Sequence, residues 1–150
     1  MRLKDVMTTR VETVTDDRPA GEAWDRMRTR RIHHLVVVRR GQVVGIVSER
    51  DLGGRNGAAV RKGKAVGDLM TPHAVTADPR APVRQAANLL RGRSIGCLPV
   101  VEGDRLVGIV TLTDLLELIG RGLERPVERT HRRPRRPEGA LRRRDLRAMR

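Results

Sequence analysis

The stretch Gly45-Ile-Val-Ser-Glu-Arg-Asp-Leu52 recurs 63 residues further along the chain as Gly108-Ile-Val-Thr-Leu-Thr-Asp-Leu115. At the same spacing, residues 5–52 align with residues 68–115 without a gap, and 18 of the 48 paired positions are identical. Self-similarity at a fixed spacing indicates that one structural unit has been duplicated. Residues 121–150 follow the second copy and lie outside the repeat.

Both copies present the same order of expected elements. A short β-prone piece leads to a proline and then to a stretch with apolar residues at helical spacing, which predicts an amphipathic helix that begins at the proline. Two β-branched runs with a glycine between them predict a hairpin, and Ser48 or Thr111 is expected to begin a second helix. In order along the chain, the β-prone segments are Val11–Val14, Leu35–Val38, Val43–Val47, Ala74–Ala77, Leu98–Val101 and Leu106–Val110, and the prolines are Pro19 and Pro82.

This order predicts an α/β (α+β) fold made of two β-α-β-β-α repeats. A unit of about 50 residues without Phe or Tyr buries too little apolar surface to offset its conformational entropy, so the two copies are expected to pack together with pseudo-two-fold symmetry. We place the first repeat at residues 3–62, the second at 63–120 and an Arg-rich tail at 121–150.

Composition excludes several classes of protein. The chain of 150 residues has a formal net charge of +14, and residues 121–150 hold twelve arginines against four acidic residues. It has one cysteine, which excludes an intramolecular disulfide and a zinc site built on several cysteines. No apolar run approaches the roughly 18 residues of a membrane span, and the first residues are too polar for a secretory signal, so a cytoplasmic location is expected.

The repeated Ser/Thr-x-x-Asp motif carries the chemistry. A hydroxyl residue that follows a strand and begins a helix lies where free backbone N–H groups favour a phosphate, and a carboxylate on the first turn can accept both hydroxyls of a ribose. The relevant residues are Ser48 and Asp51 in the first copy, and Thr111 and Asp114 in the second. The same spacing is also that of a capping box, in which the side chains satisfy only the helix end. The two roles can coexist.

Together, these motifs resemble those of a known family. Two copies of Asp-Val/Leu-Met-Thr, a helix, Ile-x-x-Leu-x-Val-Val and Gly-Ile-Val-Ser/Thr-x-x-Asp-Leu are similar to a tandem cystathionine-β-synthase (CBS) domain pair, or Bateman module, from Leu3 to about Gly120. The resemblance implies a non-catalytic regulatory module that needs no cofactor. It further implies binding of AMP, ADP, ATP or S-adenosylmethionine between the copies, signalling to an effector protein and pairing into a homodimer.

A second stretch, Ile32-His33-His34-Leu35, resembles the phosphate-holding segment of the gamma subunit of the AMP-activated protein kinase. Here His34 stands where that family member has Arg, and the second copy has Gly96 and Cys97 instead. We therefore expect different clefts, with phosphate recognition by partly charged His33 and His34. The alternative is that these are the polar end of a strand. A zinc pair is disfavoured because adjacent strand residues point to opposite faces, and no metal site is predicted.

An adenine pocket in this chain is expected to be aliphatic, because Trp24 is the only aromatic residue and its helical position places it in the core. The candidates to hold the base are Val14, Ala77, Ile32, Ile95 and Leu98, with Cys97 either beside them or simply buried.

Three further segments leave alternatives open. The Gly-rich segment Gly53–Ala65 is expected to be a mobile connector, or else a basic loop over a triphosphate. The tail at residues 121–150 is expected to be disordered, and it is either a solubilising extension or a binding segment for an acidic partner or for nucleic acid. Binding of nucleic acid would lack sequence specificity, and a nucleic-acid-associated protein is the alternative function of the chain. The apolar stripes of the first and the last predicted helix have more surface than one module can cover, which favours a homodimer through the helices. The residues named for this contact are Leu112, Leu115, Leu116 and Ile119. An enzyme is not expected, since no catalytic constellation appears.

Overall fold

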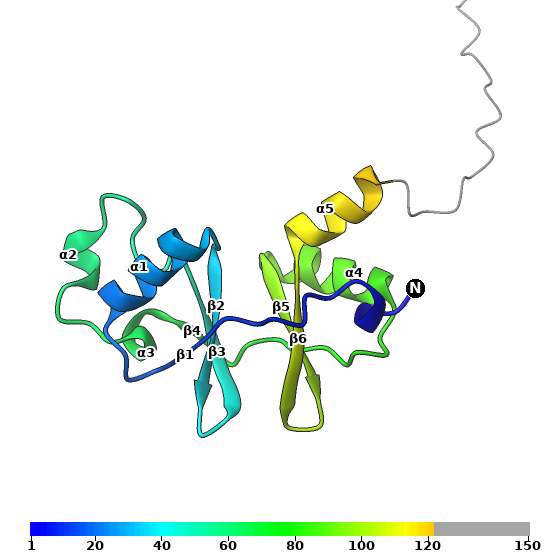
Figure 1. Cartoon of the computed structure of the whole chain (residues 1–150), viewed down its shortest axis with the longest axis horizontal. Coiled ribbons are helices and arrows are strands. Elements are labelled where there is room, and N and C mark those ends of the chain that lie inside the picture. Colours follow the sequence, from blue (N-terminus) through cyan, green and yellow to red (C-terminus); the bar gives the residue numbers. More distant parts are fainter. Residues whose placement is uncertain (122–150) are drawn as a thin grey trace, which may run out of the picture.

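The computed structural model describes residues 1–121, which form two lobes that stand side by side (Figure 1). The first lobe contains a four-stranded sheet in the order β1-β2-β3-β4. Strand β1 (Thr13–Thr15) runs parallel to β2 (His34–Arg39), which pairs antiparallel with β3 (Gln42–Ser48), and β3 pairs antiparallel with β4 (Thr71–Pro72).

Helix α1 (Ala20–Arg30) and the single-turn helix α3 (Val66–Leu69) pack on this sheet, and the single-turn helix α2 (Ala58–Arg61) lies against α1 (Figure 1). As predicted, α1 begins directly after Pro19, and its apolar stripe enters the core. The core of this lobe includes Ala20, Ala23, Trp24, Met27, Leu35, Val37, Val47 and Leu52.

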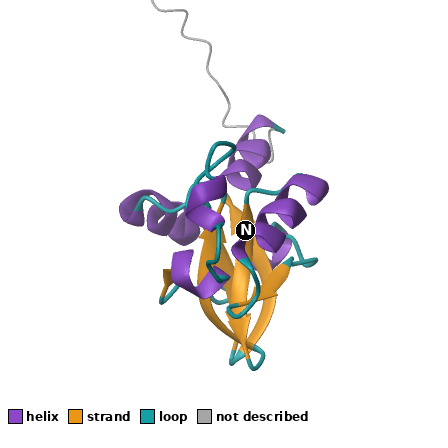
Figure 2. Cartoon of the chain, turned by 90° about the vertical axis from the view of Figure 1, so that its left-hand side faces the viewer, coloured by secondary structure: helices purple, strands orange, loops and turns teal. Residues whose placement is uncertain are grey.

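The second lobe repeats the plan with helix α4 (Val83–Arg93), the hairpin β5 (Cys97–Glu102) and β6 (Arg105–Thr111), and helix α5 (Leu112–Gly120). Viewed from one end, the strands occupy the centre and the helices flank them (Figure 2). The strand expected at Ala74–Ala77 is reduced to one parallel bridge between Ala77 and Val100, so this lobe has a two-stranded sheet. Its core includes Leu3, Ala86, Leu90, Leu98, Val100, Val110 and Leu115.

The two lobes exchange their opening segments. The N-terminal 3-10 helix η1 (Leu3–Asp5) lies in the second lobe, where Leu3 is fully buried and its N–H donates to Ala81 O at 2.9 Å. Thr8 then exchanges two backbone hydrogen bonds with Ile109 of β6, and the chain crosses to the first lobe before β1 (Figure 1). In the opposite direction, β4, which opens the second sequence copy, pairs with β3 of the first lobe.

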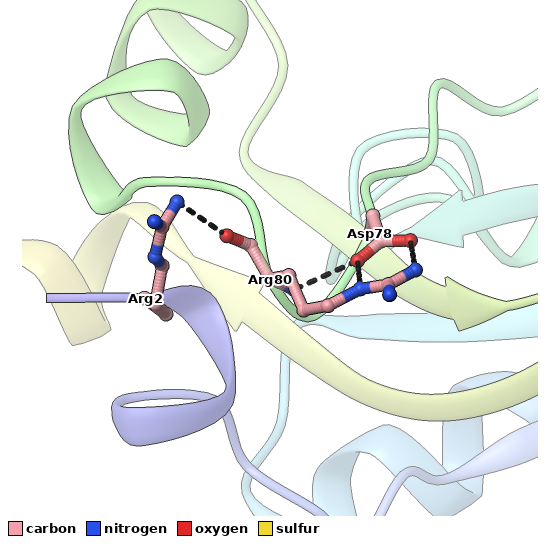
Figure 3. Close-up of polar contacts among 3 residues, drawn as sticks. All are labelled: Arg2, Asp78 and Arg80. Carbon is pink, nitrogen blue, oxygen red and sulfur yellow. Dashed lines mark hydrogen bonds and ion pairs between the residues drawn. The ribbon is translucent and has the colours of Figure 1, made fainter.

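Side chains fasten the N-terminus to the second lobe. Arg2 Nη1 donates to the carbonyl oxygen of Arg80 at 2.9 Å (Figure 3). The guanidinium of Arg80 in turn donates to both carboxylate oxygens of Asp78, at 3.1 and 3.2 Å, which lowers the pKa of that carboxyl. The start of the chain is therefore attached to the loop that precedes α4.

The exchange explains the glycine of the repeated Gly-Ile-Val motif. A Cβ on Gly45 would lie 2.6 Å from the backbone oxygen of Thr71 and 2.8 Å from Met70 Sδ. At the equivalent Gly108, a Cβ would lie 2.5 Å from Met7 Sδ. The Met-Thr pair of each sequence copy thus packs on the glycine of the other copy, where a side chain would not fit.

The prediction that a helix begins at Ser48 is wrong, because the chain forms only a single turn there. Leu52 N–H donates to Ser48 O at 3.2 Å, but the chain then leaves the helical path at Gly53 and Gly54, whose φ angles are +88° and +68°. These conformations suit glycine and cannot continue an α-helix. In the second copy, Thr111 begins the expected helix α5.

The segment Gly53–Ala65, expected to be a connector, packs against the first lobe. It contains α2, and Lys64 O accepts a hydrogen bond from Ala20 N–H at the start of α1. The predicted Arg-rich tail lies outside the described residues apart from Arg121. Within the described part of the chain, no helix has the length and apolar character needed to cross a bilayer.

Candidate ligand site between the lobes

A cleft of about 520 Å³ lies between the lobes and takes its lining from both. From the first lobe come the start of β2 and the turn after β3, and from the second come the segments before and after α4. Six of the predicted site residues are brought together there, namely His33, His34, Ser48, Asp51, Ile95 and Cys97.

The Ser48–Asp51 turn is a reciprocal capping box. Ser48 N–H donates to Asp51 Oδ2 at 2.9 Å, and Asp51 N–H donates to Ser48 Oγ at 3.1 Å. One carboxylate oxygen of Asp51 is thus held in place, and the hydrogen bonds of the described residues leave Oδ1 free to accept from a ligand. Capping and ligand binding are therefore compatible at this carboxylate.

Histidine side chains line the cleft beside this turn, because His34 pairs with Ser48 across the β2–β3 hairpin. His33 Nδ1 lies 3.0 Å from Glu49 Oε2, and the His33 side chain is largely exposed. His34 is half-buried, and a Cβ added to Gly96 of the other lobe would lie 2.9 Å from its Nε2 atom. Burial is the main cause that lowers the pKa of His34, and the neighbouring His33 acts in the same direction, while Asp51 and Glu49 oppose it. His34 is therefore less charged near neutral pH than the sequence analysis expects.

The cleft also contains polar residues that the sequence analysis did not select, including Glu49, Arg50, Thr71, His73 and Ser94. Arg50 and Glu49 flank the repeated motif, so proximity along the chain was an available signal. His73 and Ser94 enter through the packing of the lobes, and both have positive φ angles, 54° and 52°. No local pattern in the sequence predicts that placement.

The other predicted residues lie elsewhere. Thr111 and Asp114 form the second capping box, with Thr111 N–H donating to Asp114 Oδ2 at 2.8 Å, and Asp114 lines a separate cavity of about 410 Å³ beside the N-terminal segment. The aliphatic candidates Val14, Ala77 and Leu98 are buried in the two lobe cores, and Ile32 packs against the first core. Of the proposed base pocket, Ile95 and Cys97 line the cleft.

Cys97 is a buried thiol at the edge of the cleft. Burial raises its pKa to about 12, so it stays protonated at physiological pH. Over residues 1–121, no three His, Cys, Asp or Glu side chains are grouped so that they could hold a metal ion. The polar character of the cleft therefore comes from carboxylates, hydroxyls, imidazoles and the Arg50 guanidinium.

Comparison with known proteins places the chain in a family. The model of the CBS domain matches residues 3–52 and 66–121, which are the two copies of the repeat. The chain belongs to the CBS domain family. It is 34% identical over 114 residues to the CBS domain-containing protein YhcV of Bacillus subtilis, a match that covers 75% of this chain and 81% of that protein.

Other relatives carry the same pair as one part of a longer chain. Inosine-5′-monophosphate dehydrogenase of Thermoplasma acidophilum is 35% identical over 107 residues, but these represent 71% of this chain and 21% of the enzyme. The shared region is therefore the CBS pair and a minor part of that enzyme.

Solved structures of CBS domain pairs have the same fold. The pair of protein MJ0100, in complex with 5′-methylthioadenosine and S-adenosyl-L-methionine, superimposes with a TM-score of 0.73 at 29% identity, covering 81% of this chain and 97% of that one. The CBS-domain containing protein ATU1752 of Agrobacterium tumefaciens gives a TM-score of 0.71 at 29% identity, with coverages of 79% and 99%. The expected tandem CBS fold is thereby confirmed.

Proposed function

We propose that this CBS pair is a non-catalytic regulatory module that binds an adenosine-containing ligand in the cleft between its lobes and signals its presence to an effector protein. The observation that carries the proposal is the Ser48–Asp51 turn, which presents a free carboxylate oxygen to a cleft lined by both lobes. The ligand-bound pair of MJ0100, which has the same fold, supports an adenosine derivative as the ligand class.

In this proposal different residues of the cleft bind different parts of the ligand. Asp51 accepts hydrogen bonds from the ribose hydroxyls, while Ile95 and Cys97 contact the base. The 5′ substituent lies toward Ser48, Arg50 and the histidines, all of which can donate hydrogen bonds. Because both lobes contribute, a bound ligand would join them, and the change in their relative position would be the signal to the effector.

Calorimetric titration tests the proposal directly. The full-length chain is titrated separately with AMP, ADP, ATP, S-adenosylmethionine and 5′-methylthioadenosine, and guanosine and GTP are the controls. Saturable binding of at least one adenosine compound, and of neither guanosine compound, is the expected result. Absence of heat and of any change in melting temperature with all five adenosine compounds would contradict the proposed function.

We also propose that two chains associate through α5. Its side chains Leu112, Leu116 and Ile119 are 51%, 60% and 59% exposed, whereas Leu115 is 6% exposed and belongs to the core of its own lobe. Three of the four residues predicted to mediate a homodimer are therefore available, and the fourth is occupied within the chain. The first lobe offers less apolar helix surface, since β3 leads only into a turn and the single-turn helix α2.

A further inference from the structure

The two capping boxes lead into different structures. The remaining turns of α5 follow Asp114, and their backbone hydrogen bonds stabilise the Thr111–Asp114 capping box. Asp51 lies in the single turn that ends at Leu52, and the chain leaves the helical path at Gly53 and Gly54. The turn that faces the cleft is closed by backbone hydrogen bonds from Gly53 N–H to Arg50 O and from Gly54 N–H to Glu49 O, both at 3.0 Å, but it lacks the longer helix that supports its counterpart.

Arg61 of α2 adds a side-chain contact to the end of this turn. Its Nη1 atom donates hydrogen bonds to the backbone oxygens of Leu52 and Gly54, both at 2.8 Å. Leu52 directly follows Asp51, so these bonds hold the first carbonyl groups beyond the capping box. Leu52 O accepts none of the backbone hydrogen bonds of the described residues, and a carbonyl group in that position at the end of a helical turn normally needs such a donor. Gly54 O also accepts from Gly57 N–H at 3.1 Å. Gly57 helps by allowing a close approach, because a Cβ there would lie 2.4 Å from the backbone of Gly53.

The rest of the Arg61 guanidinium stacks on the first lobe. Its Cζ atom lies 4.3 Å from the ring centroid of Trp24, within the range of a cation–π contact. Trp24 lies on α1, is 8% exposed and belongs to the core of the first lobe. A planar guanidinium suits this position, since it can stack on a ring and donate within its plane at the same time.

We propose that Arg61 is a positioning residue for the cleft. It supports the end of the turn where a helix is missing, and it holds the Ser48–Asp51 turn in the form that accepts a ligand. It also links that turn to Trp24. Arg61 does not line the cleft, so it acts through the backbone of residues 52–54. This inference rests on the proposed function for its effect on affinity, but the effect on the turn is independent of any ligand.

Arg28 provides a matched control. It is also an arginine beside Trp24, with its Cζ atom 5.7 Å from the ring centroid, but none of the side-chain hydrogen bonds of the described residues joins it to residues 52–54. Arg61→Ala and Arg28→Ala remove the same charge near the same ring, and only the first removes the hydrogen bonds to the turn.

The first measurement is amide hydrogen exchange of the full-length chain without ligand. We expect Arg61→Ala to increase exchange in residues 48–54 while the amides of Thr111–Asp114 and of the core strands stay at wild-type rates. Arg28→Ala should leave residues 48–54 protected. Unchanged exchange of residues 48–54 in Arg61→Ala, or an equal increase in both variants, would overturn the proposal.

The second measurement is the dissociation constant for S-adenosylmethionine and AMP, with Trp24 emission recorded in the same titration. Because a hydrogen bond that involves a charged group is lost, we expect Arg61→Ala to weaken binding about five- to twentyfold and Arg28→Ala less than about twofold. In the wild type the ligand should change the Trp24 emission, and Arg61→Ala should abolish that change. Equal affinities for wild type and Arg61→Ala would overturn the proposal.

The variant Arg61→Lys covers the case in which Arg61→Ala fails to fold. Lysine keeps the charge but lacks the planar group, so we expect partial loss of protection in residues 48–54, and full wild-type behaviour would overturn the proposal. Should the wild type bind none of the five adenosine compounds titrated above, the proposed function fails, while the exchange of residues 48–54 still decides the role of Arg61.

Discussion

The imidazole of His34 lies against Gly96 of the opposite lobe, so closely that a Cβ on this glycine would be 2.9 Å from Nε2 and 3.1 Å from Cε1. This contact joins the two lobes at the cleft, and it places a titratable ring where solvent is partly excluded. Gly96 of the second copy and His34 of the first copy thus form one contact between the lobes in the cleft.

We predict that Gly96→Ala moves the His34 ring toward solvent and raises its pKa toward the ordinary value. The physical reason is that burial, the largest cause of the lowered pKa, is relieved when the ring moves out. The measurement is a proton NMR titration of the imidazole resonances. Gly92→Ala is the control, because a Cβ there meets nothing within 4 Å, and it should leave the pKa unchanged.

Folding stability should depend on pH through His34. Because its pKa is lowered in the folded state, the unfolded chain takes up a proton first as the pH falls. The contribution of neutral His34 is therefore fully present above the unfolded pKa of about 6.5 and is lost as the pH falls through the folded value. Urea unfolding at pH 8, 6 and 5 should show a smaller decrease in His34→Gln than in wild type. Parallel curves for the two proteins would contradict the prediction.

The lowered pKa also affects the pH dependence of ligand binding. Affinity for a phosphorylated ligand should still rise on acidification, since a protonated His34 attracts phosphate, but the rise should continue below pH 6. Calorimetry with AMP and with uncharged 5′-methylthioadenosine between pH 8 and pH 5 separates the effect of phosphate from that of the protein. Identical pH profiles for the two ligands would rule out phosphate recognition by His33 and His34.

Asp51→Asn should weaken the cleft for adenosine ligands about tenfold to a hundredfold, the usual loss for a hydrogen bond to a charged group. Asparagine retains a capping oxygen, so the free energy of unfolding should fall by less than about 1 kcal/mol. Asp114→Asn is the matched control, because Asp114 makes the same capping bonds but lines a different cavity. Equal losses of affinity in the two variants would show that Asp51 has no special role.

The two repeat glycines should respond differently to alanine. A Cβ on Gly45 meets the backbone oxygen of Thr71, which cannot move aside without shifting β4, so Gly45→Ala should cost about 1–3 kcal/mol. At Gly108 the nearest atom belongs to the flexible Met7 side chain. In a double-mutant cycle, Met7→Ala should therefore remove most of the penalty of Gly108→Ala. Met70→Ala should not rescue Gly45→Ala, and a full rescue there would contradict this account.

Self-association should depend on the exposed face of α5. Leu116→Glu with Ile119→Glu is expected to shift a micromolar solution from dimer to single chains in sedimentation experiments, because both side chains point away from their own core. Val60→Glu, at a 45% exposed position on α2, is the control and should leave the dimer intact. A wild-type chain that sediments as a monomer would contradict the proposed dimer.

Much of the architecture was readable from local patterns. The duplication, both hairpins and the helices that begin after Pro19 and Pro82 are predicted by the periodicity of apolar residues and by the fixed φ of proline, which act within a few residues of the chain. The capping boxes were equally visible, since Ser48 and Asp51 need only a spacing of three to meet. The absence of a helix after Asp51 has a local cause too, in Gly53 and Gly54, but the capping motif that Ser48 shares with Thr111 led to the wrong prediction.

The contacts that make the site depend on residues far apart in the chain. Met7 packs on Gly108, His34 lies on Gly96 and Arg61 lies over Trp24, and each pair is separated by tens of residues. No spacing rule predicts such a contact, because each exists only in the folded chain. The Met7 contact requires the exchange of the opening segments, the His34 contact requires the packing of the two lobes, and the Arg61 contact requires the packing of α2 on α1. The local pattern could thus indicate which side chains bear the chemistry, while the packing of two lobes determines which of them share a cleft and how readily His34 takes up a proton.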